Sequence, residues 1–164
     1  GEVGELCVRG PQVMKGYLKD KEKTDSVVIN IEGRRWYKTG DKCKLTPDGF
    51  VQILGRYSRF AKLGGEMISL TAVELRIAES KVMEDCEFAV TAVPDLAKGE
   101  KIVLLVKGNV NAEDVSRNLR KAGIPPLMQP GAVFVVDNIP KLGSGKWDFN
   151  GMKKMAMELV ENKA

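Results

Sequence analysis

The sequence predicts an α+β protein in two parts. Residues 1–57 are expected to form a small β-barrel-like subdomain, and residues 58–164 a C-terminal α/β domain with a three-stranded sheet flanked by helices. Two observations predict this division. Up to about Leu54, short runs alternate apolar and polar residues, which is typical of half-buried strands. After Gly55, a polar and glycine-rich segment marks a boundary, and helical and strand-like patterns then follow one another.

The strand signals of the first part are short. Leu6 and Val8 alternate with polar neighbours, and Trp36-Tyr37 begins another strand-like run. The stretch Thr46-Pro47-Asp48-Gly49 indicates a turn, because proline presets φ and glycine accepts a positive φ. It leads into an apolar run over residues 50–54. Together these segments predict the hairpins of a small barrel or sheet.

The second part begins with a predicted helix over residues 71–81. Thr71 and Glu74 have the spacing of a capping box, in which each side chain bonds a backbone N–H of the first helical turn. Leu70 and Leu75 are placed to form a hydrophobic staple across the same turn. We therefore expect the helix to begin at Thr71.

Three strands are expected after this helix. Alternation from Cys86 to Ala92 predicts a strand that stops at Pro94-Asp95. The continuous apolar run from Ile102 to Val106 predicts a second strand that pairs with the first. Residues 132–136 predict the third.

Two more helices complete the second part. Asn111 is expected to cap a helix that Gly123 and Pro125-Pro126 end. The last helix follows Asp148. Each helix places apolar residues on one face. These residues are Val115, Leu119 and Ala122 in the helix after Asn111, and Met152, Met155, Ala156, Leu159 and Val160 in the helix after Asp148. We interpret the methionine-rich face of the last helix as core packing.

Composition excludes several classes of function. No apolar run approaches the roughly 18 residues that cross a bilayer, so no transmembrane segment is expected. The net charge of +4 is spread along the chain, so no nucleic-acid partner is expected. With no histidine and three widely spaced cysteines, we predict free buried thiols and no metal site. The chain opens with Gly1 and no leader, and we expect an excised fragment.

The first motif with possible chemistry is the loop at residues 140–146, Pro-Lys-Leu-Gly-Ser-Gly-Lys. Backbone N–H groups and Lys146 suit a phosphate or carboxylate there. The loop is not a Walker A motif, because Pro140 and Trp147 stand where that motif needs a glycine and a hydroxyl residue. Considered alone, the loop is better explained as a flexible turn carrying a solvated lysine than as a binding site.

Two further motifs are ambiguous alone. In the run from Tyr37 to Asp41, the aspartate could accept hydrogen bonds from both ribose hydroxyls, or it could simply cap a turn. The basic segment from Arg56 to Glu66 ends in two glycines before the glutamate. It could bind phosphate, or it could be a linker whose glycines absorb backbone rotation.

The order and intervals of the three motifs resemble the acyl-adenylate-forming superfamily, which contains acyl-CoA synthetases, adenylation domains of peptide synthetases and beetle luciferases. The opening residues Gly4-Glu5-Leu6, Gly10, Gly16-Tyr17-Leu18 and Thr24 resemble the family segment ahead of its Tyr-x-Thr-Gly-Asp motif. Within the family, residues 60–70 and 142–149 look most like the bifunctional acyl-[acyl-carrier-protein] synthetase/2-acylglycerophosphoethanolamine acyltransferase.

The resemblance implies a role for each motif. Residues 1–57 would end a large N-terminal domain, and residues 58–164 would form a mobile domain that rotates about Ser58 between two half-reactions. Ser58 departs from the aspartate or lysine that the family often carries at the hinge. The expected roles are these: Lys146 and Lys62 are catalytic, Asp41, Arg56, Tyr37 and Thr39 bind the nucleotide, and Gly64, Gly65 and Glu66 form the thiol-acceptor loop.

The resemblance also implies the substrates. They are ATP, with Mg2+ bound mainly by the part of the parent enzyme that precedes this chain, a fatty acid, and coenzyme A or the phosphopantetheine of an acyl carrier protein. We expect a cytoplasmic enzyme. The resemblance leaves open whether the parent enzyme associates with the cytoplasmic face of the inner membrane. The chain alone is expected to be inactive.

Two alternatives stay open. One is an ordinary acyl- or aryl-CoA ligase. The other is a non-enzymatic module that docks an acidic carrier protein, although such charges usually form a solvated face. The basic residues considered for docking are Arg34, Arg35, Lys42, Lys44, Arg56, Arg59 and Lys62.

Overall fold

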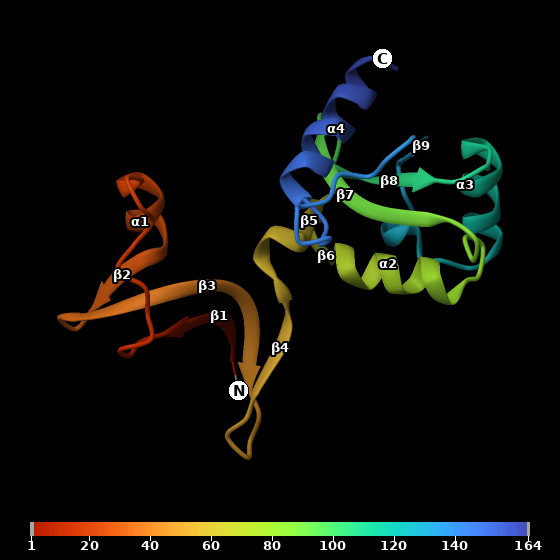
Figure 1. The fold of residues 1–164 in the computed structure, drawn as a ribbon. Helices are drawn as coiled ribbons and strands as arrows, with labels where there is room; N and C mark the ends of the chain where they lie inside the picture. The colour runs from red at the N-terminus through yellow and green to blue at the C-terminus, as the bar shows by residue number, and fades with distance from the viewer. Residues whose placement is uncertain (1, 164) are drawn as a thin grey trace. The chain divides into compact units, whose positions relative to one another are not determined.

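The computed structural model describes residues 2–163 (Figure 1). The chain divides into two compact units, with the division between Ser58 and Arg59. The first unit contains a four-stranded sheet and one helix. Its elements are β1 (Val3–Val8), α1 (Lys21–Val27), β2 (Val28–Ile31), β3 (Arg34–Leu45) and β4 (Val51–Arg56).

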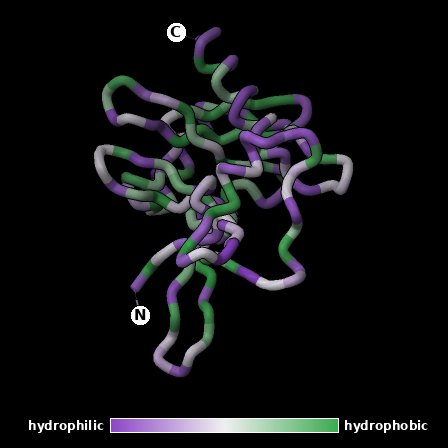
Figure 2. Tube along the Cα trace, turned by 90° about the vertical axis from the view of Figure 1, so that its left-hand side faces the viewer, coloured by the Kyte–Doolittle hydropathy of each residue, from purple (hydrophilic) through white to green (hydrophobic). Residues whose placement is uncertain are grey.

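The long strand β3 organises the first unit, because β1, β2 and β4 all pair with it in antiparallel register. The predicted turn at residues 46–49 joins β3 to β4, and the Thr46 N–H donates to the Phe50 carbonyl at 2.8 Å. In Figure 2 this hairpin, at the bottom of the view, changes repeatedly between hydrophobic and hydrophilic residues. The sheet is open, so the barrel-like expectation was wrong. The sequence pattern also missed helix α1, which Asp20 caps through its side chain.

The second unit is a sheet covered on both faces by helices (Figure 1). Short 3-10 turns lie at Tyr57–Arg59, where the units join along the chain, and at Pro126–Met128. The remaining elements are β5 (Phe60–Leu63), β6 (Glu66–Ser69), α2 (Leu70–Glu79), β7 (Glu87–Asp95), β8 (Gly99–Lys107), α3 (Ala112–Lys121), β9 (Ala132–Val135) and α4 (Phe149–Glu161).

The sheet has five strands instead of the predicted three. The order is β6-β5-β8-β7, and β9 pairs with β8 in parallel. The two additional strands, β5 and β6, come from the polar, glycine-rich segment that was expected to be only a boundary. The predicted pairing of the first two strands is confirmed as β7 with β8, and β7 runs on through Pro94 to Asp95.

Strand β8 explains the apolar run at residues 102–106. Ile102, Leu104 and Val106 pack with α2 and α3 on one face, and Val103 and Leu105 pack with α4 on the other. A strand buried on both faces needs apolar side chains at every position. Met152 and Ala156 of α4 are fully buried against this second face, so the methionine-rich face is core packing.

Helix ends show where local signals were sufficient. Asn111 caps α3, as predicted, by accepting from the N–H groups of Glu113 and Asp114. Helix α4 follows Asp148, as expected, and Asp148 caps it. Helix α2 is capped by Ser69, so the expected Thr71 cap was wrong. Leu75 is exposed, so it forms no staple. All three cysteines are free thiols but partly exposed, whereas buried thiols were predicted.

Candidate functional site

The first candidate site lies where β3 meets β1 and β4. Glu5 pairs with Lys42 and Cys7 pairs with Lys38, so Leu6 alone opposes Thr39, Gly40 and Asp41. This bulge re-aims the side chains of the strand, as bulges beside functional sites often do. Gly40 has φ +77°, which a residue with a side chain adopts only with strain.

Hydrogen bonds fix the bulge. The Thr39 hydroxyl donates to the Leu6 carbonyl at 3.0 Å and accepts from the Asp41 N–H at 3.1 Å. The Gly40 N–H donates to Glu5 Oε1 at 3.2 Å. Thr39 therefore positions the aspartate that follows it.

Asp41 and Arg56 are directly opposite each other on β3 and β4. Arg56 Nε lies 2.9 Å from Asp41 Oδ1, and its guanidinium also donates to the Thr39 carbonyl at 2.7 Å. The aspartate side chain is 27% exposed and the arginine 58%. The pair is thus accessible, and carboxylate oxygen remains to accept hydrogen bonds from a ligand's hydroxyls.

Tyr37 precedes this site on β3, opposite Val28 of β2 and Val8 of β1. Burial raises the pKa of its phenol above the ordinary value, and a hydrogen bond with Tyr17 adds to the effect. The phenol is therefore neutral at physiological pH. The structure brings Tyr37, Thr39, Asp41 and Arg56 into one small region of the first unit.

In the second unit, β5 and β6 form a tight hairpin. Gly64 and Gly65 form its two-residue turn, with φ of +57° and +97°. Two positive φ values define the turn type that matches the twist of paired strands. Lys62 is exposed on β5, and Glu66 begins β6. The backbone N–H of Lys62 donates to Glu100 Oε2 at 2.7 Å, and that of Gly64 donates to the Lys98 carbonyl at 2.9 Å, so β8 and the turn before it hold the hairpin.

The Lys146 loop is a second tight hairpin, closed by backbone hydrogen bonds of 2.8 Å from Gly145 N–H to Leu142 O and from Leu142 N–H to Lys146 O. Gly145 has φ +81°, which suits the glycine position of a three-residue hairpin loop. Lys141 forms an ion pair with Glu87 of β7 and lies over the Trp147 ring. The Lys146 side chain is exposed, and no ion-pair partner is found for it in residues 2–163. Backbone hydrogen bonds thus close the loop, and its lysine side chain is exposed to solvent.

An interaction that was not predicted lies behind this loop. Arg59 is buried, and its guanidinium contacts Glu74 of α2 at 2.6 Å and donates to the Val90 carbonyl at 2.7 Å. It also lies 4.4 Å from the centroid of the Phe149 ring, which begins α4 just after the lysine loop. Glu74 accepts from the Val90 N–H at 2.9 Å. Arg59 thus joins α2, β7 and the start of α4.

A sequence signal for this network exists. Leu70, Val73, Glu74 and Ile77 lie on one helical stripe, and the three apolar members are buried. A carboxylate inside an apolar stripe indicates a buried cationic partner. The interpretation of Glu74 as part of a capping box concealed this signal.

The other predicted residues lie apart. Ser58 is exposed in the 3-10 turn directly before Arg59. Lys62 and Lys146 are on different hairpins, and no contact between their side chains is found in the described part of the chain. Among residues 2–163, no group of three or more cysteine, aspartate or glutamate side chains is placed to hold a metal ion. None of the helices described is long and apolar enough to span a bilayer.

Comparison with known proteins assigns this architecture to a family. Residues 73–146 match the family described as AMP-binding enzyme C-terminal domain. The second unit therefore contains an AMP-binding enzyme C-terminal domain, which is part of the acyl-adenylate-forming superfamily.

Particular relatives agree. The chain is 33% identical to nonribosomal peptide synthetase sidE of Aspergillus fumigatus, covering 98% of this chain and 8% of that protein. It is 32% identical to the vibriobactin-specific 2,3-dihydroxybenzoate-AMP ligase of Vibrio cholerae, covering 94% of this chain and 28% of that ligase. The crystal structure of ATP-bound MatB from Rhodopseudomonas palustris matches with a TM-score of 0.74 at 27% identity, covering 97% of this chain and 31% of that one. The chain thus spans less than a third of each of these relatives.

Proposed function

We propose that this chain is the C-terminal portion of an ATP-dependent ligase that joins a carboxylate to AMP and then transfers the acyl group to a thiol. The observation that carries the proposal is the Lys146 loop. Its backbone is held by hydrogen bonds and by the Lys141–Glu87 ion pair, yet its lysine is exposed and unpaired in the described residues. A cation that is positioned but not neutralised can stabilise charge that develops elsewhere.

In the proposed first half-reaction, the Lys146 ammonium lies between the substrate carboxylate and the α-phosphate of ATP. Negative charge increases there as the carboxylate attacks and pyrophosphate leaves, and a fixed ammonium stabilises that transition state. We assign nucleotide binding to Asp41, Arg56, Tyr37 and Thr39. The Asp41 carboxylate accepts the ribose hydroxyls, and Arg56 both orients it and contacts the ribose. We expect Mg2+ to accompany the ATP phosphates and to be bound mainly by the part of the parent enzyme that precedes this chain.

In the proposed second half-reaction, rotation about Ser58 exchanges the Lys146 loop for the β5–β6 hairpin. Lys62, Gly64, Gly65 and Glu66 then line the path of the thiol. The glycine turn supports this assignment, because it lacks side chains that would obstruct a narrow path. We assign residues 1–57 to the end of the large domain and residues 58–164 to the mobile domain.

The substrate class is a finer proposal. Residues 60–70 and 142–149 support a bifunctional acyl-[acyl-carrier-protein] synthetase/2-acylglycerophosphoethanolamine acyltransferase as the parent. Its acid is then a fatty acid and its acceptor the phosphopantetheine of an acyl carrier protein, in the cytoplasm or at the cytoplasmic face of the inner membrane. The alternative is an aryl- or acyl-CoA ligase. The similarity to a 2,3-dihydroxybenzoate-AMP ligase supports an aryl acid as the substrate in this alternative. Assaying the parent with coenzyme A and with carrier protein separates the two.

The test of the mechanism is Lys146→Ala in the parent enzyme. We expect adenylate formation, measured by ATP–pyrophosphate exchange, to fall by at least about 100-fold. Transfer of the acyl group from preformed acyl-adenylate should remain near the unmodified rate, because Lys146 acts only in the first step.

The matched control is Lys153→Ala, which removes an exposed lysine of α4 and should leave both half-reactions unchanged. Equal loss of both half-reactions in Lys146→Ala would contradict the assignment.

A non-enzymatic docking module is less well supported. Arg59 is buried and Arg56 is paired with Asp41, so two of the seven basic residues considered for docking already have partners within this chain. A salt-sensitive complex between this chain and an acidic carrier protein would favour docking.

A further inference from the structure

A second surface of the second unit lies outside the residues assigned above. Strand β9 pairs with β8 along one edge, from Val103↔Ala132 to Val106↔Val135. Within residues 2–163, no strand pairs with its other edge. A strand edge presents a row of backbone N–H and C=O groups, which makes it a template for another extended chain.

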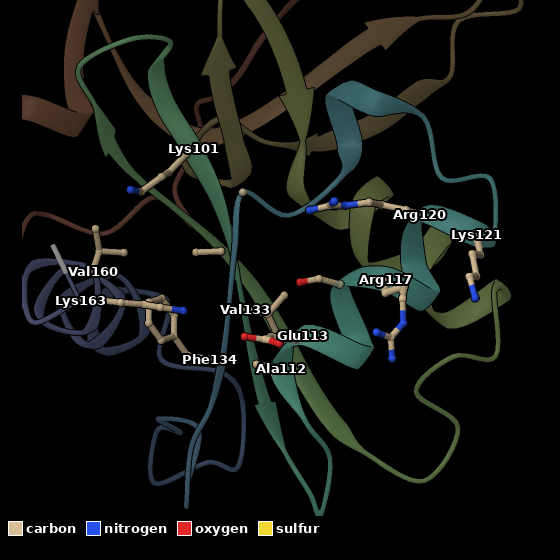
Figure 3. Close-up of a pocket in the computed structure, with 13 residues that line it drawn as sticks. Lys101, Ala112, Glu113, Arg117, Arg120, Lys121, Val133, Phe134, Val160 and Lys163 are labelled. Carbon is tan, nitrogen blue, oxygen red and sulfur yellow. The ribbon is translucent and has the colours of Figure 1, made fainter.

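The free edge forms the floor of an open groove of about 790 Å³. Figure 3 looks onto the strand that carries Val133 and Phe134, with α3 on one side and α4 on the other. Val133 packs into the core beneath α3, and Phe134 packs beside α4, so the strand keeps its side chains on the two flanking layers. Ala132 and Phe134 remain partly exposed and line the groove, whereas Val133 is buried.

The walls of the groove are strongly cationic. Five basic side chains line it, against a single carboxylate, Glu113. The five are Lys101, Arg117, Arg120, Lys121 and Lys163.

Only part of this charge is neutralised locally. Lys101 lies 3.8 Å from Asp95, and Arg117 pairs with Asp114. Arg120 and Lys121 are exposed, and neither has an ion-pair partner in the described chain. Excess positive charge beside a free strand edge favours an acidic ligand and disfavours a second copy of this chain, which carries the same charge.

We propose that this groove binds an acidic, extended peptide segment of a partner protein, which adds a strand to the free edge of β9. Main-chain hydrogen bonds to β9 give the register, and the basic side chains of α3, together with Lys101 of β8 and Lys163 just after α4, select acidic residues. A segment of four to six residues matches the length of β9, at about 3.3 Å per residue. The inference goes beyond the proposed ligase function, because Lys62 and Lys146 do not line the groove.

The test is a nuclear magnetic resonance titration of the whole chain, labelled with ¹⁵N, with a capped heptapeptide of alternating valine and aspartate. Amide resonances of residues 131–135 should shift and gain protection from hydrogen exchange. The same peptide with N-methyl groups on alternate residues, on the edge that faces β9, should bind at least about tenfold more weakly, because it cannot complete the ladder.

Variants test the charge requirement. Arg120→Glu with Lys121→Glu should weaken binding at least about tenfold, and Lys15→Glu with Lys21→Glu, an equal charge change in the first unit, should not. The proposal is overturned if the N-methylated peptide or a single-stranded oligonucleotide binds as tightly as the heptapeptide, or if the amides of β9 do not respond.

Discussion

The guanidinium of Arg59 has a side-chain exposure of 6%, and its partner Glu74 has 22%. Both charges also bond the backbone of Val90, one through its carbonyl and the other through its N–H. Removing one member of a buried ion pair leaves the other charge without compensation, and this costs more than the net value of the intact pair. At the scale of single residues, Arg59 is therefore a polar position where a substitution should strongly destabilise the second unit.

We predict that Arg59→Met lowers the free energy of unfolding by about 3 kcal/mol, because it leaves the partly buried Glu74 carboxylate without its counter-ion and the Val90 carbonyl without its donor. The double variant with Glu74→Met should recover part of this loss, since it removes the second charge. The measurement is urea denaturation of the whole chain followed by circular dichroism.

Arg76→Met is the control, because Arg76 pairs with Glu79 on the same helix with both side chains over 60% exposed. Its effect should be below about 1 kcal/mol. If Arg59→Met proves no more destabilising than Arg76→Met, the buried pair does not stabilise the unit.

At the scale of elements, the β5–β6 hairpin depends on its two glycines. The positions of Gly64 and Gly65 lie in the left-handed region, and an added Cβ would meet no atom within 4 Å at either. Any cost of substitution is therefore backbone strain and not a clash. Because the turn sets the register from Phe60↔Ser69 to Leu63↔Glu66, strain there affects the whole hairpin.

Gly65→Ala is predicted to destabilise the second unit by about 1–2 kcal/mol, the cost of a left-handed conformation for an L-residue. Gly64→Asn should cost less, because asparagine tolerates this region near φ +57°. Thermal unfolding of the two variants checks the order. Gly143→Ala, at an open position without a positive φ, is the matched control and should be neutral or slightly stabilising.

Elements also show how far sequence reasoning extends. Asn111 was predicted as a cap, and the last helix was expected to follow Asp148, because such signals act on the backbone within three residues. The strands β7 and β8 likewise follow from local apolar patterns. From sequence alone, either Ser69 or Thr71 could cap α2. Strand β6 ends at Ser69, which pairs with Phe60 of β5, so the helix begins directly after Ser69. Local patterns do not contain that information.

The candidate site also has parts that local sequence predicts and parts that it does not. The motif around Asp41 and the loop around Lys146 are contiguous in sequence, so they could be found by reading the chain. The Asp41–Arg56 pair depends on the register of β3 and β4, and the Arg59–Glu74 pair depends on the packing of α2 against β7. Non-local pairing turned Arg59 from an expected surface charge into a buried one.

At the scale of the whole molecule, the two units differ in their interiors. The second unit holds all the fully buried residues, including Val90, Leu104 and Ile77, whereas no residue from 2 to 58 is fully buried. The first unit instead leaves large apolar side chains exposed, such as Phe50 at 69% and Ile53 at 53%. Since burial of apolar surface is the main stabilising contribution to folding, the first unit has little stability of its own.

We therefore predict unequal stability within the chain. Amides of β7 and β8 should exchange only through global unfolding, whereas amides of β1–β4 should exchange through local opening and be at least about 100-fold less protected. Hydrogen exchange followed by mass spectrometry measures both sets in one sample.

Substitutions should follow the same division. Leu104→Ala, in the buried centre of β8, should cost about 2–5 kcal/mol of global stability. Phe50→Ser, on the exposed turn side of β4, should change it by less than about 0.5 kcal/mol. Equal protection of the two units, or a large global effect of Phe50→Ser, would show that the first unit is stabilised within this chain itself. The expected result would instead mean that the unit carrying Asp41 and Arg56 has little stability while its apolar side chains stay exposed.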